Sequence, residues 1–283
     1  MKKKLALILA SVMAMGCIAT GCGNKAAETT KETSAESAVE TTAAESGDKM
    51  TFTVGFDASF PPYGYQENGE YVGFDLDLAQ EVCDRNGWEL VKTPIDWDAK
   101  DMELNSGAID CIWNGFTING REEDYTWTKP YVDNTQVFVV KKDSGITSAA
   151  DLAGKTVLVQ ADSSALAALT DEENEETKAL KDSFAALTEV PDYETALLEL
   201  EQGTADAVAM DEGVALAKQS KNDNIIILDD EISKEQYGIG FKLGNEDLRD
   251  QVWATLLEME KEGVVDEIAA KYGINTDNIC IGE

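Results

Sequence analysis

The sequence predicts an α/β fold with a mainly parallel sheet, built either as one large domain or as two lobes. Three observations carry this prediction. Apolar segments alternate with helical ones from residue 51 onwards, and the strand–helix pattern restarts near residue 135. The region that begins at Met50 is also long enough to bury a sizeable core. No close internal sequence repeat accompanies the restart.

The first half begins with a strand over residues 51–56, where apolar and polar side chains alternate. Asp75 is expected to N-cap a helix with an apolar inner side, and Gly87 is expected to end this helix. The remaining elements of this half are a strand over 88–95, a helix over 98–106 stopped by Gly107, and an apolar strand over 109–113.

The second half repeats the alternation of strands and helices. Residues 172–177 are strongly acidic, and we expect them to form an exposed loop. Strands are expected over 135–141, 155–160, 206–210, 225–228 and 237–241, and helices over 149–154, from 163, and over 193–201, 247–262 and 264–272.

The N-terminus has the pattern of a secretory signal peptide over residues 1–21. Three lysines precede a short apolar run that is too short for a comfortable membrane span. Ala19-Thr20-Gly21-Cys22 then resembles the lipobox of bacterial lipoproteins, in which the cysteine is lipidated. Cys17 is a weaker second candidate, and an ordinary signal peptide with incidental cysteines is the alternative. Residues 22–50 lack aromatic side chains and are expected to form a flexible tether.

The composition excludes several classes of function. The formal net charge is −32, which argues against nucleic-acid binding and indicates a solvated, repulsive surface. The chain contains no histidine, so Ser-His-Asp and Cys-His catalysis and the commonest transition-metal ligand are unavailable. We expect no cofactor and no metal ion, although carboxylate chemistry stays open.

The cysteines outside the signal peptide give one ambiguous pairing. With Cys22 assigned to lipid, three remain, so at least one is unpaired. Cys111 lies in an apolar strand and is expected to be a small core residue. A disulfide between Cys83 and Cys280 is one alternative for the other two.

Two complementary charges follow apolar strands in the two halves of the chain. Arg121 follows the segment that begins at Trp113, and Asp211 follows residues 206–210. A guanidinium can hold a carboxylate bidentately, and a carboxylate can hold an ammonium. Ligands of open α/β sheets bind beyond the carboxyl ends of strands, so two halves that closed on one another would clamp a zwitterion. The alternatives are a surface salt bridge for Arg121 and a helix cap for Asp211.

The loop over residues 55–65 follows the first strand and carries two prolines and three aromatic side chains. A stiff aromatic loop suits a ligand cleft, because part of its ordering cost is already met. Phe60 is therefore a candidate ligand contact, and packing against the core is its alternative. Residues 70–75 are expected to have a structural role as a turn and helix cap.

An ordered set of motifs makes the chain similar to a known family. The set consists of Phe60-Pro61-Pro62-Tyr63, Tyr71-Val72-Gly73-Phe74-Asp75, Asn114-Gly115-Phe116-Thr117-Ile118 before Arg121, Trp127-Thr128-Lys129-Pro130-Tyr131, Asp151-Leu152-Ala153-Gly154-Lys155, Ala205-Asp206-Ala207-Val208 and Gln236-Tyr237-Gly238-Ile239. In this order they resemble the bacterial extracellular solute-binding proteins of family 3, the amino-acid receptors of ABC importers. The resemblance covers residues 51–272.

The resemblance implies a periplasmic-binding-protein-like fold in which two α/β lobes are joined by two hinge strands. Lobe 1 would comprise residues 51–132 plus 237–283, and lobe 2 residues 137–232. Arg121 matches the position that binds the α-carboxylate, and Asp211 the position that binds the α-ammonium. The other implied ligand residues are Gly115 and Thr117, the aromatic pair Phe60 and Trp97, the lobe 2 loop residues Gln160, Ser163 and Ser164, and the candidate side-chain readers Asp57 and Asn114.

One turn departs from the family pattern. Many relatives have one more residue between the threonine and the arginine than this chain has between Thr117 and Arg121. Gly120 is expected to permit the shorter turn through a backbone conformation that other residues avoid. Arg121 stays the candidate because Trp127-Thr128 keeps its usual distance from it.

The sequence thus predicts a lipid-anchored receptor, a monomer, on the outer face of the cell membrane. It would bind a free, polar α-amino acid by hinge closure and deliver it to the permease of an ABC importer. One rival is a dehydratase of amino-acid-like acids with Asp57 as general acid. A lipoprotein that senses its ligand through a partner and a purely structural lipoprotein or adhesin are the others.

Overall fold

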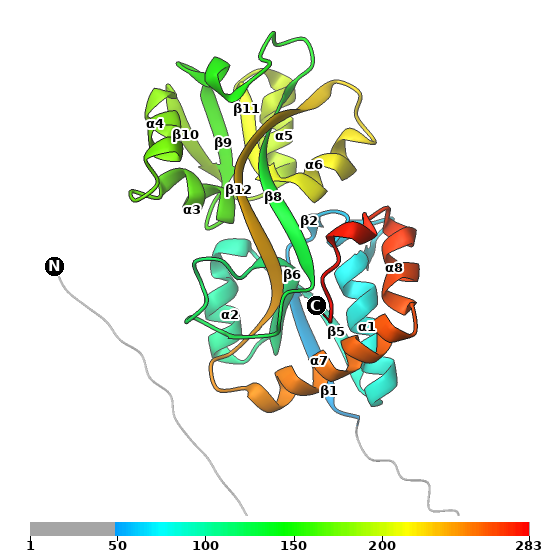
Figure 1. Cartoon of the computed structure of the whole chain (residues 1–283). Coiled ribbons are helices and arrows are strands. Elements are labelled where there is room, and N and C mark those ends of the chain that lie inside the picture. The colour runs from blue at the N-terminus through cyan, green and yellow to red at the C-terminus, as the bar shows by residue number, and fades with distance from the viewer. Residues whose placement is uncertain (1–48, 283) are drawn as a thin grey trace, which may run out of the picture. The chain divides into compact units, whose positions relative to one another are not determined.

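Two long strands, β8 (Val132–Lys141) and β12 (Ile225–Phe241), connect the two ends of one sheet. The computed structural model describes residues 49–282, and Figure 1 shows both strands running between an upper and a lower group of elements. The predicted signal peptide, the predicted lipidation site Cys22 and all but the last two residues of the predicted tether lie outside the described residues. Across the described residues, no helix is both long and apolar enough to span a membrane.

The lower group, which we call lobe 1, is built on three parallel strands and is completed by the C-terminal part of β12. Strand β1 (Thr51–Phe56) pairs in parallel with β5 (Glu89–Pro94) and β6 (Cys111–Thr117), and β12 pairs antiparallel with β6 and with β7 (Thr126–Trp127). Its helices are α1 (Phe74–Asn86), the 3₁₀ turn Trp97–Ala99, α2 (Lys100–Ser106), α7 (Glu246–Lys261), α8 (Val264–Tyr272) and the 3₁₀ turn Thr276–Asn278.

The two faces of this sheet carry different helices. Trp113 of β6 belongs to the core cluster that contains residues of α1, whereas its neighbour Ile112 belongs to a second cluster with Leu104 of α2. Successive side chains of a strand point to opposite faces, so α1 and α2 cover opposite sides (Figure 1). The C-terminal helices α7 and α8 return to pack on α1.

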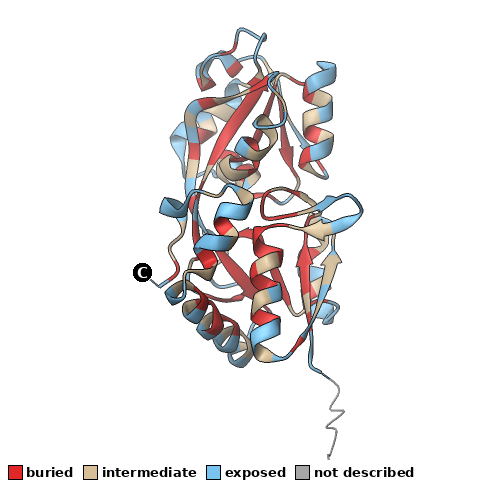
Figure 2. Cartoon of the chain, turned by 90° about the vertical axis from the view of Figure 1, so that its right-hand side faces the viewer, coloured by how far each residue is buried: buried red, intermediate tan, exposed pale blue. Residues whose placement is uncertain are grey.

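The upper group, lobe 2, repeats the same construction. Strand β9 (Thr156–Gln160) pairs in parallel with β10 (Ala186–Val190) and β11 (Ala207–Asp211), and β11 pairs antiparallel with β8. Its helices are the 3₁₀ turn Ala149–Leu152, α3 (Ser164–Thr170), α4 (Glu175–Ser183), α5 (Tyr193–Gln202) and α6 (Glu212–Gln219). In Figure 2 the strands of both lobes are largely buried and the outer faces of the helices are exposed.

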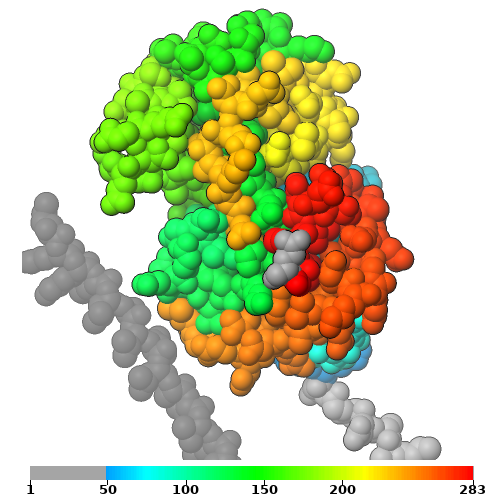
Figure 3. All heavy atoms as spheres, in the orientation of Figure 1, coloured from blue at the N-terminus to red at the C-terminus, as the bar shows by residue number. Residues whose placement is uncertain are grey.

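The connection between the lobes is an antiparallel ladder of β8 and β12. Their pairing runs from Ile225 opposite Lys141 to Tyr237 opposite Val132, and its register shifts on either side of Glu231. The space-filling view shows β12 at the surface where the two lobes meet (Figure 3). The sheet therefore continues through both lobes, with its irregular pairing close to the junction.

Most predicted elements are present, but the sequence misjudged several segments. Residues 225–228 and 237–241 belong to the single strand β12, and β10 was not predicted. Part of the predicted acidic loop 172–177 is the start of α4, where the Asn174 side chain accepts hydrogen bonds from two backbone N–H groups. The predicted loop after β1 contains part of a small antiparallel sheet, β2 (Ser59–Phe60), β3 (Gly64–Glu67) and β4 (Glu70–Val72).

Asp75 was wrongly predicted to cap α1. Gly73 is the N-cap residue, and the fully buried Asp75 points across to β6. Its Oδ2 accepts the backbone N–H of Gly115 at 2.7 Å and the hydroxyl of Tyr131 at 2.8 Å. Burial raises the pKa of Asp75 to about 7. Asp75 therefore does not start α1; it holds the backbone of Gly115, a candidate ligand residue.

The prediction for Cys111 is confirmed, whereas the possible disulfide of Cys83 is not formed. Cys111 is a fully buried core thiol, as predicted. Cys83 is also a buried free thiol, so it forms no disulfide with Cys280. Burial raises the pKa of the Cys83 thiol to about 12, which makes it unreactive.

Candidate ligand-binding site

The candidate residues gather where the lobes meet, because the strands that carry them end there. Thr117 ends β6, Gln160 ends β9 and Asp211 ends β11, while Asp57 follows β1. All four are buried, with at most 6% of their surface exposed. The carboxyl ends of strands from both lobes therefore face one junction, the usual place for a ligand in α/β folds.

Arg121 is held by the short turn that follows β6. Its backbone N–H bonds to the carbonyl of Ile118 at 2.9 Å, and Gly120 has a φ of 79°, so the predicted glycine-dependent turn is confirmed. The guanidinium lies over Phe116 and donates to the carbonyl oxygens of Thr117 at 3.3 Å and, across the junction, Asp162 at 3.1 Å. A guanidinium has five N–H donors, so further donors stay available for an anion.

Asp211 is surrounded by hydrogen-bond donors. Its Oδ1 accepts from Asn134 Nδ2 at 2.9 Å, Gln136 Nε2 at 2.7 Å and the hydroxyl of Tyr237 at 2.6 Å. Its Oδ2 accepts from the hydroxyl of Tyr193 at 2.7 Å. Asp211 occupies the N-cap position of α6, but its side chain makes no cap hydrogen bond. The helix-cap explanation for this carboxylate is therefore excluded.

Burial also changes the proton affinity of Asp211. Removal from water, followed by the nearby carboxylate of Glu235, raises the pKa of Asp211 to about 7. The hydrogen bonds from Tyr237, Tyr193 and Gln136 act in the opposite direction. An ammonium placed here would relieve a costly buried charge.

A second contact across the junction joins Asp57 and Gln160. Gln160 Nε2 donates to Asp57 Oδ2 at 2.8 Å and to the carbonyl of Pro191 at 3.1 Å. Burial raises the pKa of Asp57, although hydrogen bonds from the Ser59 N–H and Gln160 oppose this. Asn114 Oδ1 accepts the backbone N–H of Asp57 at 2.9 Å, which places Asn114 behind the loop as its support.

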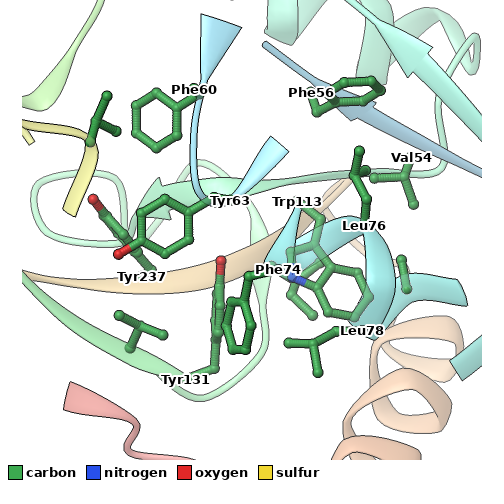
Figure 4. Close-up of a cluster of buried hydrophobic side chains, with 14 of the residues drawn as sticks. Val54, Phe56, Phe60, Tyr63, Phe74, Leu76, Leu78, Trp113, Tyr131 and Tyr237 are labelled. Carbon is green, nitrogen blue, oxygen red and sulfur yellow. The ribbon is translucent and has the colours of Figure 1, made fainter. Parts of the chain in front are cut away.

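The two candidate aromatic residues belong to separate clusters. Phe60 stacks on Tyr193 of lobe 2, with ring centroids 5.8 Å apart and planes at 25°, and contacts Tyr63. Figure 4 shows Tyr63 next to both Phe60 and Tyr237. Trp97 is half-buried and packs edge-to-face on Phe116. Phe60 therefore packs in the hydrophobic core and also contacts lobe 2 at the junction between the lobes.

The backbone at Gly115 requires glycine. Its φ is 57°, and a Cβ atom there would lie 2.7 Å from Phe60 and 3.0 Å from Tyr237. Its N–H donates to Asp75 Oδ2 at 2.7 Å and to the hydroxyl oxygen of Tyr131 at 3.2 Å. This peptide is therefore fixed in place beside the junction.

The two serines of the lobe 2 loop have different roles. Ser163 Oγ accepts the N–H of Leu166 at 3.2 Å and caps α3. Ser164 Oγ donates to Glu235 on β12. Thr117, Ser164 and Glu235 line one pocket of about 390 Å³.

A larger pocket of about 580 Å³ opens elsewhere at the junction. Its lining includes Asp57 and Trp97 from lobe 1 and Asp192 from lobe 2. Asp96, Asp98 and Glu103 add further carboxyl groups to its wall. The excess of acidic groups favours a polar or cationic group in this pocket over an anionic one.

Sequence reasoning missed two buried charged residues at the junction. Lys100, on α2, has a side chain only 1% exposed and forms an ion pair with Asp162 of lobe 2. Glu235, on β12, is 5% exposed and shares donors with Asp211. Glu235 directly precedes the Gln236-Tyr237-Gly238-Ile239 motif, which was the available signal. Across the described residues, no group of three or more His, Cys, Asp or Glu side chains could hold a metal ion.

Arg121 and Asp211 thus lie in two different groups of contacts. Arg121 bonds to the carbonyls of Thr117 and Asp162, whereas Asp211 shares amide donors with Glu235. One pocket borders both groups, since it is lined by Thr117, whose carbonyl Arg121 contacts, and by Glu235, which shares amide donors with Asp211. The junction therefore has a cationic group on one side of this pocket and acidic groups on the other.

Known proteins resemble the chain over nearly all of the described residues. The glutamine-binding protein GlnH of an ABC transporter from Bacillus subtilis (strain 168) is 31% identical over 278 residues, which are 96% of this chain and 97% of GlnH. The L-cystine-binding protein TcyJ from Escherichia coli (strain K12) is 29% identical over 230 residues, which are 80% of this chain and 83% of TcyJ.

A solved structure shares the fold. The substrate-binding protein of an ABC uptake transporter from Streptococcus pneumoniae, crystallised with bound histidine, has a TM-score of 0.73 and 33% sequence identity. The match covers 78% of this chain and 92% of that protein. The model of the bacterial extracellular solute-binding proteins, family 3, matches residues 52–275, and the chain therefore belongs to this family.

Proposed function

We propose that this protein captures a free, polar α-amino acid between its lobes and delivers it to the permease of an ABC importer. The observation that supports this most directly is the placement of Arg121 and Asp211. They come from different lobes and lie at the same junction, beyond the carboxyl ends of β6 and β11. A zwitterion presents one group of the matching charge to each of them.

Every α-amino acid carries an α-carboxylate and an α-ammonium, and we propose a protein partner for each. Arg121 holds the α-carboxylate with its free N–H groups, helped by the loop that contains Ser163 and Ser164. Asp211 holds the α-ammonium, whose charge offsets the cost of burying this carboxylate. The Thr117 hydroxyl and the Gly115 backbone complete the contacts.

The ligand side chain is proposed to extend towards the larger pocket. Asp57, Trp97 and Gln160 would read it, with Phe60 on the other side and Asn114 positioning the Asp57 loop. The acidic lining supports a polar side chain and disfavours an anionic one. Binding is proposed to occur without turnover, so Asp57 is a reader and not a general acid.

Closure is proposed to be a hinge motion of the β8–β12 ladder, with lobe 1 at residues 51–132 plus 237–283 and lobe 2 at 137–232. The contacts of Asp162 with Lys100 and Arg121, and of Gln160 with Asp57, would form only when the lobes approach. A ligand that touches both lobes stabilises this closed arrangement. The hinge is proposed to lie near residues 131–136 and 233–237, and the register shifts of β12 between Ile227 and Ser233, directly beside the second segment, support it.

The cellular setting is proposed from the N-terminal sequence. We propose that residues 1–21 are a signal peptide, that Cys22 carries the lipid, and that residues up to 50 tether a monomer to the outer face of the membrane. Two or three acyl chains would anchor it firmly. Labelling with radioactive palmitate should depend on Cys22, and a labelled Cys22→Ala variant would contradict this anchor.

Thermal unfolding against all common amino acids plus cystine tests the binding function. A ligand at 100 times its dissociation constant should stabilise the protein by about 2.7 kcal/mol. Arg121→Ala should abolish the shift, whereas the control Arg85→Ala, an exposed residue paired with Glu81 and Glu262, should retain it. A flat response of the unmodified protein, or normal affinity in Arg121→Ala, would contradict the proposal. Product formation from the bound amino acid would favour the dehydratase.

A further inference from the structure

Two buried carboxylates, Asp211 and Glu235, share the same pair of amide donors. Asn134 Nδ2 lies 2.9 Å from Asp211 Oδ1 and 2.8 Å from Glu235 Oε1. Gln136 Nε2 lies 2.7 Å from the first of these oxygens and 2.8 Å from the second. All four residues are at most 7% exposed. The two acidic groups therefore form one site.

Neutral donors surround this site. In the described residues the remaining hydrogen bonds to the two carboxylates come from the hydroxyls of Tyr193, Tyr237 and Ser164. Two buried negative charges without a cationic partner are expensive, since neutral hydrogen bonds replace only part of the lost hydration. The site therefore requires a cation or a proton.

The site also contains one buried acceptor, on Gln136, that receives no hydrogen bond from the described residues. Gln136 is fully buried, and within residues 49–282 its Oε1 has no hydrogen-bond partner, although its Nε2 contacts both carboxylates. Glu235 also lines the 390 Å³ pocket beside Thr117 and Ser164. A primary ammonium has three N–H donors, so it can engage several acceptors at once.

We infer that Glu235 is a second carboxylate of the ammonium site, and that the ligand ammonium binds Asp211 and Glu235 together with Gln136 Oε1. This inference rests on the proposed function and assigns residues to its cationic end. Glu235 and Gln136 lie on the strands that join the lobes, and Ser164 connects Glu235 to lobe 2. The ammonium therefore acts directly on the strands that we propose as the hinge.

The site should also exchange a proton for the ligand. Burial and Glu235 raise the pKa of Asp211 to about 7, and the other titratable groups nearby are Tyr63, Tyr193, Tyr237 and Glu212. These tyrosines stay neutral, because burial raises their pKa values further above 10, and Glu212 adds negative charge. Below about pH 7 the site carries a proton that the ammonium must displace. Affinity should therefore fall as the pH falls, by at most tenfold per pH unit.

The test compares Glu235→Gln with a matched control, Glu231→Gln, on the same strand. Glu231 has a half-exposed side chain paired with Lys234. The probes are the common L-amino acids and L-cystine, titrated calorimetrically into both variants and the unmodified protein at pH 8 and pH 6. We expect Glu235→Gln to weaken binding at least tenfold at pH 8 and Glu231→Gln to change it less than twofold.

A second measurement uses the unmodified protein alone. Titration at pH 6 in buffers of different ionisation enthalpy should show release of close to one proton per ligand bound. Equal affinity of Glu235→Gln and the unmodified protein at pH 8, or binding at pH 6 without proton release, would overturn the inference while leaving the proposed function intact. Failure of every amino acid to bind the unmodified protein would overturn both.

Discussion

Replacing Gly115 by alanine should destabilise the protein through two separable effects. The first is the backbone, because φ is 57° and an L side chain in this left-handed region costs about 1 kcal/mol. The second is overlap, because the new Cβ would lie 2.7 Å from Phe60 Cε1 and 3.0 Å from Tyr237 Cε2. Overpacking of a close-packed interior costs about 1–3 kcal/mol. The total loss in the free energy of unfolding should therefore be about 2–4 kcal/mol.

Gly107 supplies the control for this experiment. It also has a left-handed φ, 80°, at the end of α2, but a Cβ atom there meets nothing within 4 Å. Gly107→Ala should therefore lose only the backbone contribution of about 1 kcal/mol. Urea unfolding of both variants without ligand measures the difference. If Gly115→Ala lost no more stability than Gly107→Ala, the close approach to Phe60 and Tyr237 would be disproved.

Two further predictions concern buried charges. Burial raises the pKa of Asp75 to about 7, so the folded state binds a proton there that the unfolded state has lost, and stability should fall by up to about 1.4 kcal/mol per pH unit as the pH rises from 4 to 7. Asp75→Asn should flatten this slope in urea unfolding, and the exposed Asp143→Asn should leave it unchanged; an unaltered slope in Asp75→Asn would rule out this origin. Lys100→Met should remove the ion pair to Asp162 and shift the ligand-free protein towards a more open form, seen as a larger radius of gyration in small-angle X-ray scattering. Lys221→Met, which removes a 69%-exposed partner of another ion pair between the lobes, should have little effect, and equal radii for the two variants would contradict a special role of Lys100.

The positions of most elements follow from local sequence. Periodicity and turn residues predicted β1, β6, β9 and β11 and most helices, because a strand or helix must show an apolar face to its core. The start of α4 is an example of a local signal that pointed to the wrong element. The acidic residues after Asn174 looked like a solvated loop, yet negative charge is also favourable at a helix N-terminus, and α4 begins there.

Some residues of the candidate site could likewise be predicted from the sequence, and others could not. Arg121 and Asp211 could be named as candidates from the sequence, because each follows an apolar strand and carries a charge that suits a zwitterion. Lys100 and Glu235 were missed, because a lysine in a short helix and a glutamate outside any predicted strand are ordinary surface residues unless the lobes bury them. Only the position of Glu235 next to the Gln236-Tyr237-Gly238-Ile239 motif pointed to it. Asn114 was expected to contact the ligand, and the structure places it behind the Asp57 loop.

By itself, the sequence determined the α/β class, the order of most elements, the absence of histidine chemistry and the two charges, Arg121 and Asp211, that we propose to hold a zwitterion. Only the tertiary structure decided which partners those charges have. The donors to Asp211 include Asn134 and Gln136 of β8 and Tyr237 of β12, and Asn134 is 77 residues away in the chain. The physical reason is that hydrogen bonding and burial depend on distance in space. The pairing of β8 with β12, and not local periodicity, brings the Gln136 amide within hydrogen-bond distance of the Glu235 carboxylate.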